Sequence, residues 1–105
     1  MFTRHVIMQL KANSASEFTS TVEKTILPMM RKQKGFRDEI TFISTDGSEA
    51  IANSFWSTKE EAEAYNDAVY PQVLKALSKV VEGTPRVGTA VVSNSTFHKI
   101  AAQAA

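Results

Sequence analysis

The sequence feature that most constrains the fold is an Asp-Gly pair, Asp46-Gly47, which stands between two runs of β-prone residues. A two-residue turn of type I′ needs positive φ at both central positions, and Asp-Gly is one of the pairs that adopt it readily. The pattern therefore predicts a β-hairpin with strands over residues 36–45 and 48–56. A two-residue loop also sets the register, which pairs Thr45 with Ser48, Phe42 with Ile51, Ile40 with Asn53, Glu39 with Ser54 and Arg37 with Trp56.

Side chains alternate between the two sides of a strand, so the hairpin has two distinct faces. The first face is apolar and is expected to pack against the core: Ile40, Phe42, Ile51 and Phe55. The second face mixes polar, small and aromatic side chains: Arg37, Glu39, Thr41, Ile43, Ala50, Ala52, Ser54 and Trp56. We expect the functional site to lie over this second face. Asn53 shares the first face and is expected to point toward the helices as a buried, hydrogen-bonded amide.

The N-terminal third of the chain is predicted to form a strand and a helix. Residues 2–10 alternate as a strand, with Phe2, Val6, Met8 and Leu10 on one face and Thr3, His5, Ile7 and Gln9 on the other. Residues 14–17, SASE, fit a capping box that begins a helix. Pro28 is expected to kink that helix near Leu27, because proline removes a backbone hydrogen bond. Gly35 stands where a left-handed helix end is expected.

The C-terminal half is predicted to repeat the pattern of helix followed by strand. Residues 58–61, TKEE, form a second capping box. Pro71 suits the first turn of a following helical segment, which is expected to end at residues 83–85. Residues 86–98 are predicted to form the last strand, and Gly88 within it is expected to mark a bulge.

The resulting order, β-α-β-β-α-β, predicts a ferredoxin-like α+β fold with a four-stranded antiparallel sheet. We expect a single domain over residues 1–98 and a short tail at 99–105. Two helices on one side leave the other side of the sheet uncovered, and the uncovered side is expected to hold Ile7, Ile43, Ala50, Ala52 and Trp56. Large exposed apolar patches mark interfaces. We therefore predict a homodimer in which two sheets face each other about a twofold axis, with a cavity between them.

Composition disfavours several classes of function. The 105 residues carry a formal net charge of +1, so the chain lacks the basic surface typical of nucleic-acid binding. It has no apolar run long enough to cross a membrane, and no membrane partner is expected. The absence of cysteine fits a reducing compartment, and the protein is predicted to be cytoplasmic. No glycine-rich nucleotide motif occurs and His5 and His98 are far apart in sequence, so neither a cofactor nor a metal is expected.

Two stretches have the character of family signatures. Residues 26–36, ILPMMRKQKGF, place a proline before apolar residues, basic residues and a Gly-Phe step. Residues 55–65, FWSTKEEAEAY, place a tryptophan at a strand end before a Ser/Thr-capped helix with an alanine and a ring. Together they resemble the helix-to-strand passage and the second signature of the antibiotic biosynthesis monooxygenase (ABM) family. With the predicted order of elements, the resemblance spans roughly the whole chain and implies a dimeric α+β barrel.

The resemblance implies a cofactor-free oxygenase that acts on a small aromatic or polyphenolic substrate, in a cavity between sheet and helices or between subunits. Such chemistry needs a deprotonated, electron-rich substrate, a dry pocket and polar groups that bind a phenolate. The candidate catalytic residues are His5, Arg37 and Trp56, and the candidate substrate-binding residues are Thr41, Ser54, Tyr65 and Tyr70. Arg37 would stabilise the phenolate, and His5 or His98 would take its proton.

Other interpretations stay open beside this one. The haem-degrading branch of the family needs an axial histidine on the second helix, and residues 70–77 contain none. A dimer that binds a small apolar ligand without turnover, or a purely structural dimer, would fit the same pattern. In those cases Trp56 is a packing residue with Arg37 stacked on it, Tyr65 is a core residue with its hydroxyl at the rim, and His98 lies at the surface.

Overall fold

The computed structural model describes residues 1–97, so His98 and the predicted tail at 99–105 lie outside the described residues. The elements are, in chain order, β1 (Phe2–Leu10), α1 (Ala15–Thr21), the π-helical turn η1 (Val22–Ile26), α2 (Leu27–Arg31), β2 (Phe36–Ile43), β3 (Glu49–Trp56), α3 (Lys59–Ala68), α4 (Tyr70–Leu77) and β4 (Val81–Val91). None of the helices in residues 1–97 has the length and apolar character needed to span a bilayer.

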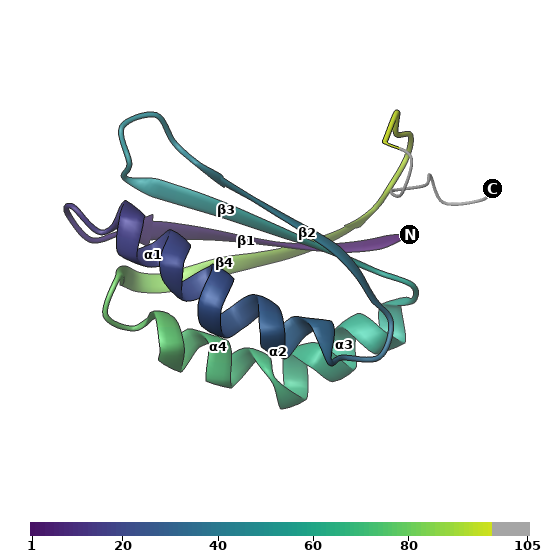
Figure 1. The fold of residues 1–105 in the computed structure, drawn as a ribbon. Helices are drawn as coiled ribbons and strands as arrows, with labels where there is room; N and C mark the ends of the chain where they lie inside the picture. The colour runs from purple at the N-terminus through teal and green to yellow at the C-terminus, as the bar shows by residue number, and fades with distance from the viewer. Residues whose placement is uncertain (98–105) are drawn as a thin grey trace.

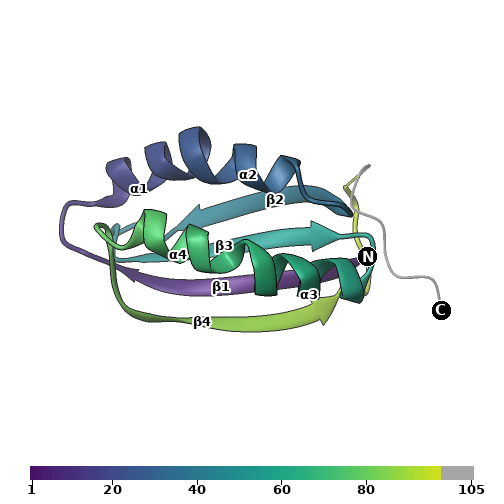
Figure 2. The ribbon, with the colours of Figure 1, turned by 90° about the horizontal axis from the view of Figure 1, so that it is seen from below.

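The strands form one antiparallel sheet in the order β2-β3-β1-β4. The helices of residues 1–97 all lie on one side of this sheet, and no helix of the described residues covers the other side, which is here called the uncovered side (Figure 1). Seen from the helix side, the two helical segments lie next to each other along the strands (Figure 2). This arrangement is the predicted ferredoxin-like α+β fold, and the prediction of fold class is confirmed.

The β2–β3 hairpin has the predicted register but a different turn. Phe42 pairs with Ile51, and Ile40 pairs with Asn53. The prediction of a type I′ turn is wrong, because Gly47 has a φ of 76° while Asp46 does not have positive φ. The turn is instead closed by a hydrogen bond of 2.8 Å from the Gly47 N–H to the Ser44 carbonyl. The strand pairs end with Ile43 and Ala50, so the predicted pair of Thr45 and Ser48 does not form.

Asp46 stabilises this longer turn through its side chain. Its Oδ1 atom accepts hydrogen bonds from the Ser48 N–H at 3.0 Å, the Ser48 hydroxyl at 2.7 Å and the Ser44 hydroxyl at 2.8 Å. These bonds, led by the one from the Ser48 backbone, lower the pKa of Asp46 to about 2. Asp-Gly thus forms the turn through side-chain capping as well as through the glycine conformation.

A β-bulge at Arg37 replaces the predicted pair of Arg37 and Trp56. Phe36 pairs with Trp56, and the register then shifts between Phe36 and Asp38, so that Arg37 is an extra residue. The Phe36 ring packs edge-on against the Trp56 indole with 5.6 Å between ring centroids. Arg37 is exposed, and its Nε donates to the Ser57 hydroxyl over 2.5 Å. It does not stack on the indole.

The first helical segment is interrupted where a disturbance was expected. A π-helical turn, η1, directly precedes α2, and Pro28 lies in the first turn of α2. Proline has no N–H to donate to the preceding turn, so the regular α-helical ladder cannot continue through it. The widened turn is how this chain accommodates the break.

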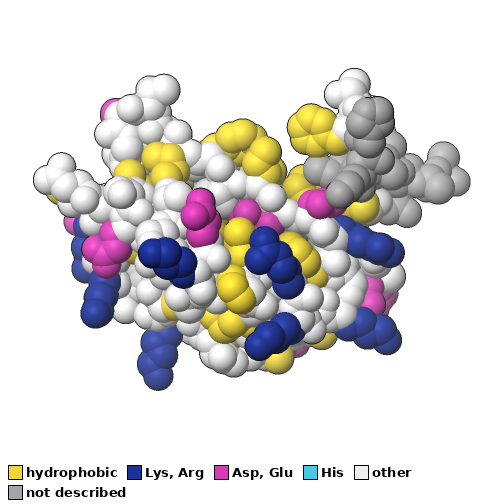
Figure 3. All heavy atoms as spheres, viewed as in Figure 1, with side chains coloured by type: hydrophobic (Ala, Val, Ile, Leu, Met, Phe, Trp, Pro, Cys, Tyr) yellow, Lys and Arg dark blue, Asp and Glu magenta, His cyan; other side chains and the backbone are white. Residues whose placement is uncertain are grey.

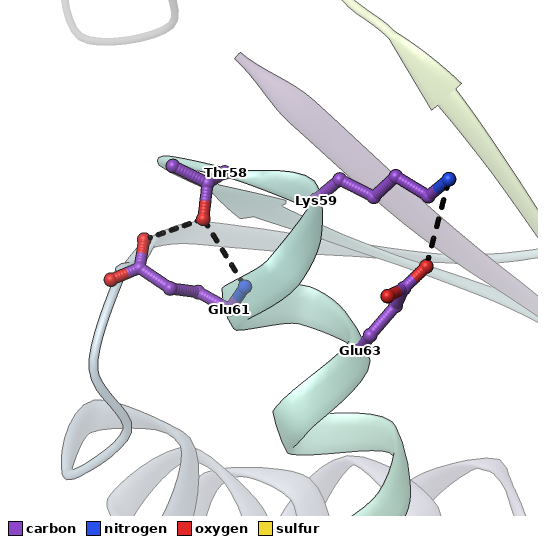
Figure 4. A network of polar contacts seen from close by, with 4 residues as sticks. All are labelled: Thr58, Lys59, Glu61 and Glu63. Carbon is purple, nitrogen blue, oxygen red and sulfur yellow. Dashed lines mark hydrogen bonds and ion pairs between the residues drawn. The ribbon is translucent and has the colours of Figure 1, made fainter.

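The two predicted capping boxes have different outcomes. The Ser14 hydroxyl forms no hydrogen bond to a helix N–H, so the first box is absent. Thr58 does cap α3, because its Oγ1 accepts from the Glu61 N–H at 3.1 Å and its hydroxyl donates to the Glu61 carboxylate at 3.1 Å (Figure 4). Lys59 and Glu63 add an exposed ion pair of 3.7 Å on the same helix (Figure 4).

The last strand begins and ends earlier than predicted. Helix α4 stops at Leu77, and β4 starts at Val81. Residues 83–85, expected to end the helix, lie inside β4, where its register with β1 shifts. The predicted bulge at Gly88 is therefore displaced to this point. Gly88 pairs with His5, and the His5 ring occupies the space that a Cβ at Gly88 would need.

The two faces of the hairpin are reversed relative to the prediction. Trp56 is fully buried and packs on Tyr65 of α3, with 4.9 Å between ring centroids. The side of β3 that carries Trp56 therefore faces the helices. Phe42, on the predicted core face, is 55% exposed, and Asn53 shares its side of the sheet, away from the helices. Both faces are apolar enough to form a core, and pairing with β1 selects the one beside Val6, Met8 and Leu10.

The uncovered side of the sheet is apolar, but most of its residues differ from those predicted. Ile7 lies there as expected, whereas Ile43, Ala50, Ala52 and Trp56 face the helices. Alternation and register place Ile40, Phe42, Ile51 and Phe55 on the uncovered side with Ile7. Hydrophobic side chains are visible along this side of the molecule (Figure 3). The homodimer stays a prediction.

Candidate functional site

A cavity lies between the sheet and the helices of a single chain. The space not filled by protein atoms is about 490 Å³ when the open solvent at its mouth is included, and about 50 Å³ of it has room for the centre of a water molecule. Its floor is the helix-facing side of the sheet, where Ala52 and Ser54 of the inner strand β3 have short side chains. Its roof is formed by apolar residues of the helical segments: Phe18, Val22, Ile26, Met30, Val73, Leu74 and Leu77. The cavity forms because the small side chains of Ala52 and Ser54 leave space beneath the larger apolar side chains of the helical segments.

Arg4 of β1 places a positive charge in the wall of this cavity. Its side chain is 3% exposed, and its Nη2 donates to Oδ1 of Asn66 over 2.7 Å. The guanidinium carbon lies 4.0 Å from the centroid of the Tyr70 ring and 5.3 Å from that of Tyr65. Cation–π contact with two rings compensates in part for lost hydration.

Arg4 has no carboxylate partner in residues 1–97, where the one salt bridge joins Lys59 and Glu63. A buried cation without a counter-ion is costly, and such charges are normally paired. The guanidinium therefore retains capacity to bind an anion that enters the cavity.

Glu39 of β2 places a carboxyl group in the opposite part of the lining. Burial raises the pKa of Glu39 above its ordinary value, and the hydroxyl of Thr41, which donates to Oε2, lowers it in part. Glu39 lines both the cavity and a surface cleft between β2 and the first helical segment. It is therefore in a position to contact both a bound molecule and solvent.

Two tyrosines complete the polar part of the lining. Burial raises the pKa of Tyr65 to about 12, an effect that the Arg4 charge opposes and the Glu39 charge reinforces. Burial also raises the pKa of Tyr70, again against the effect of Arg4. Both phenols are therefore neutral near pH 7, and each can donate a hydrogen bond to a bound oxygen anion.

Ser54 connects the cavity floor to the core. Its hydroxyl oxygen accepts from the Trp56 Nε1–H at 2.9 Å, and the hydroxyl donates to the Arg4 carbonyl at 3.4 Å. Trp56 itself does not line the cavity. The indole is a packing residue that orients the floor.

The structure brings together the predicted substrate-binding residues and separates the predicted catalytic residues from them. The four predicted substrate-binding residues all line the cavity: Thr41, Ser54, Tyr65 and Tyr70. The three predicted catalytic residues do not. His5 lies on the uncovered side of the sheet beside Gly88, Arg37 is exposed at the bulge, and Trp56 is in the core.

Arg4 is a candidate functional residue that the sequence pattern did not single out, and Glu39 lies on the second face of the hairpin, where no role is predicted for it. The signal for Arg4 was present in the alternation of β1, where one charged residue interrupts the apolar series Phe2, Val6, Met8 and Leu10. A charge in a strand's apolar face is seldom fully buried unless it is compensated or functional.

The arrangement can bind an aromatic anion in an apolar cavity. It offers a guanidinium for the negative charge, neutral phenols as donors and a carboxyl as a proton acceptor. Within residues 1–97, no group of three or more histidine, cysteine, aspartate or glutamate side chains is arranged to hold a metal ion.

Comparison with known proteins supports the fold. The sequence matches no family model and no curated protein. Among solved structures, the chain superposes on SnoaB, a cofactor-independent oxygenase from Streptomyces nogalater, with a TM-score of 0.74, 15% identity and coverage of 90% of this chain and 95% of that one. It superposes on the monooxygenase from the gene ActVA-Orf6 of Streptomyces coelicolor, solved with nanaomycin D, with a TM-score of 0.73, 17% identity and coverage of 85% and 84%.

A candidate antibiotic biosynthesis monooxygenase from Nitrosomonas europaea is similar as well, with a TM-score of 0.71, 11% identity and coverage of 85% of this chain and 86% of that one. The predicted resemblance to the ABM family is thus confirmed at the level of the fold. At identities of 11% to 17%, what this chain shares with these proteins is the fold.

Proposed function

We propose that the protein is an ABM-like, cofactor-independent monooxygenase that acts on a small phenolic substrate in the cavity between its sheet and helices. The observation that carries this proposal is Arg4, a buried guanidinium that faces an apolar cavity without a carboxylate partner in residues 1–97. A phenolate is the ligand that supplies both the missing negative charge and an apolar ring. Tyr65 and Tyr70 would donate further hydrogen bonds to its oxygen.

The reaction would use the substrate as its only reductant. Loss of the hydroxyl proton makes the ring electron-rich, and Arg4 favours that ionised form. The ring then transfers electrons to O₂, and one oxygen atom becomes a carbonyl on a ring carbon. The second oxygen atom leaves as water with the two hydrogens that the ring carbon and the hydroxyl have lost. All four electrons come from the substrate, and the protein contributes binding, orientation and exclusion of bulk water.

The activities of two structural neighbours agree with this reaction class. SnoaB is named as a cofactor-independent oxygenase, and the Streptomyces coelicolor protein is a monooxygenase that was solved with a nanaomycin ligand. The fold they share with this chain is compatible with the proposed chemistry, although their identities to it are 15% and 17%.

Oxygen uptake with a panel of phenols and quinols tests the proposal. Wild-type protein should consume oxygen faster than the uncatalysed reaction with at least one of them. Arg4→Met should lose about 100-fold or more in turnover, the typical effect of removing a charge-stabilising donor. Arg31→Met, an exposed arginine of α2, is the matched control and should retain full turnover. Equal turnover of both variants, each checked for a native circular dichroism spectrum, would refute the role of Arg4.

A second candidate function is binding without turnover, which an apolar cavity lined by a few polar groups also favours. In that case a phenol would bind to the wild-type protein, Arg4→Met would weaken it, and no oxygen would be consumed. Measuring affinity and oxygen uptake on the same samples separates the two candidates.

The quaternary structure belongs to the proposal as well. We propose that residues 1–98 form one domain and that two copies pair through the uncovered apolar side of the sheet. Phe42→Asp would place a charge on that side, so sedimentation at equal concentration should find a dimer for wild type and a monomer for the variant. The cytoplasmic location stays a prediction.

A further inference from the structure

Arg4 and Glu39 stand at two positions of one row across the sheet. Arg4 pairs with Ser54 on β3, and Ser54 pairs with Glu39 on β2. Because neighbouring strands lie about 4.8 Å apart, the backbones of Arg4 and Glu39 are separated by about 10 Å. The short side chain of Ser54 lies between them. The cavity floor thus has the Arg4 guanidinium at one end and the Glu39 carboxyl group at the other, with the short Ser54 side chain between them.

The two charged ends face the same space without neutralising each other. Both side chains line the cavity. The Tyr65 phenol is influenced by both, since Arg4 lowers its pKa and Glu39 raises it, beside the larger effect of burial. No salt bridge joins Arg4 to Glu39 within the described residues. The two charges therefore remain separated along the cavity floor.

The Glu39 carboxylate has room for one more donor. Thr41 donates to Oε2, and no hydrogen bond from residues 1–97 reaches Oε1. Burial already disfavours the charged form of this group. A hydroxyl that donates to the free oxygen would stabilise the carboxylate, in the same way that a bound oxygen anion would compensate Arg4.

We propose that the cavity selects a bipolar aromatic molecule, with an oxygen anion directed to Arg4 and a second hydroxyl that donates to Glu39. This inference rests on the proposed function for the choice of aromatic hydroxyl compounds, and it narrows their class. A ring system with oxygen functions at opposite ends, as in a quinol, satisfies both charged residues. A monophenol or a methyl ether offers no donor to Oε1 of this half-buried carboxylate, so such a ligand lacks one charge-assisted hydrogen bond that a quinol would form.

Two naphthoates that do not need to react provide the test. In 6-hydroxy-2-naphthoate, the carboxylate stands in for the phenolate at Arg4 and the hydroxyl reaches toward Glu39. In 6-methoxy-2-naphthoate, the hydroxyl proton is replaced by a methyl group and the ring is unchanged. Affinities are measured by fluorescence titration, and chemical shifts of the two tyrosines place the ligand in the cavity. Wild-type protein should bind the hydroxy acid about tenfold more tightly or better.

Variants at both ends of the cavity make the test specific. Glu39→Leu should reduce the preference for the hydroxy acid to less than about twofold, because the charged acceptor is gone. Glu39→Gln keeps a neutral acceptor, so its preference for the hydroxy acid should lie between those of wild type and Glu39→Leu. This variant replaces Glu39→Leu in the test if the leucine variant does not fold. Arg4→Met should weaken both acids by the same factor and leave the preference intact. Glu60→Leu, the same change on the exposed first turn of α3, should alter nothing.

The outcomes separate this inference from the proposed reaction. Equal affinity of wild-type protein for the two acids, a preference that survives Glu39→Leu, or binding of neither acid would overturn the bipolar cavity. A preference that depends on Glu39 would support it. If that preference is found but no quinol is oxidised, the proposed oxygenase reaction fails while the selectivity of the cavity stands.

Discussion

Replacing Trp56 with phenylalanine tests the structural role assigned to the indole. The change removes the 2.9 Å hydrogen bond from Nε1 to the buried Ser54 hydroxyl, a loss of about 1 kcal/mol. The smaller ring also leaves a void in a position that has no exposed surface. Complete truncation of a buried tryptophan costs about 3–5 kcal/mol, so loss of one ring should cost about 1 kcal/mol. With the lost hydrogen bond and the void combined, Trp56→Phe should be about 2 kcal/mol less stable than wild type.

Thermal and urea unfolding at equal chain concentration would measure this loss. About 2 kcal/mol corresponds to a fall of about 8–16 °C in Tm for a domain of this size. Phe97→Leu, a change in an aromatic residue that is 60% exposed, is the control and should stay within about 0.5 kcal/mol of wild type. A Trp56→Phe protein with unchanged Tm and lost turnover would refute the packing role and restore the predicted catalytic one.

Three further predictions concern single residues. Thr58→Ala should lower the free energy of unfolding in urea by about 1 kcal/mol, because it removes the side chain that caps α3. The Ser14 side chain caps no helix N–H, so Ser14→Ala should change that free energy by less than about 0.5 kcal/mol. Equal losses in the two variants would contradict the assigned caps. Gly35 and Gly83 both have positive φ, so alanine at either position should cost about 1–2 kcal/mol of stability. Of these two positions, only Gly35 has a neighbouring side chain that an added Cβ would meet. Gly35→Ala should therefore lower Tm more than Gly83→Ala does. Glu39 has a raised pKa in the folded protein, so its favourable contribution is complete below the pKa of the unfolded chain and is lost as pH rises through the folded pKa. Glu39→Gln should match wild-type stability near about pH 4 and exceed it at neutral pH, and a variant that is less stable than wild type at neutral pH would contradict the burial of that charge.

The hairpin register was predictable from the sequence, but its orientation was not. Alternation and the position of Asp46-Gly47 pair Phe42 with Ile51 whichever turn type forms, because a longer loop with the same centre conserves the register. The same alternation creates two faces, and in this hairpin both contain enough apolar surface to be buried. Only the pairing of β3 with β1, a contact between distant parts of the chain, decides that Trp56 meets the helices.

The candidate site was predictable where residue type and face were both informative. Thr41 and Ser54 were assigned to the functional face, and they reached the cavity even though that face was expected to be uncovered. Arg37 failed because a single-residue bulge, which no pattern in the strand announces, removes it from the ladder. The sequence pattern did not identify Arg4, because Phe2, Val6, Met8 and Leu10 make that face of β1 appear uniformly apolar. Arg4 is the one charged residue on this face.

The bulge also determines how the chain tolerates changes in length. Elsewhere in β2, deletion of one residue would shift the following pairs and turn every later side chain to the opposite side of the sheet. Arg37 has no partner across the ladder, because the residues on both sides of it already pair with consecutive positions of β3. A chain without Arg37 would keep Phe36 on Trp56 and Glu39 over the cavity, and its ladder would become regular. Homologues one residue shorter at this point can therefore retain the same core and the same site.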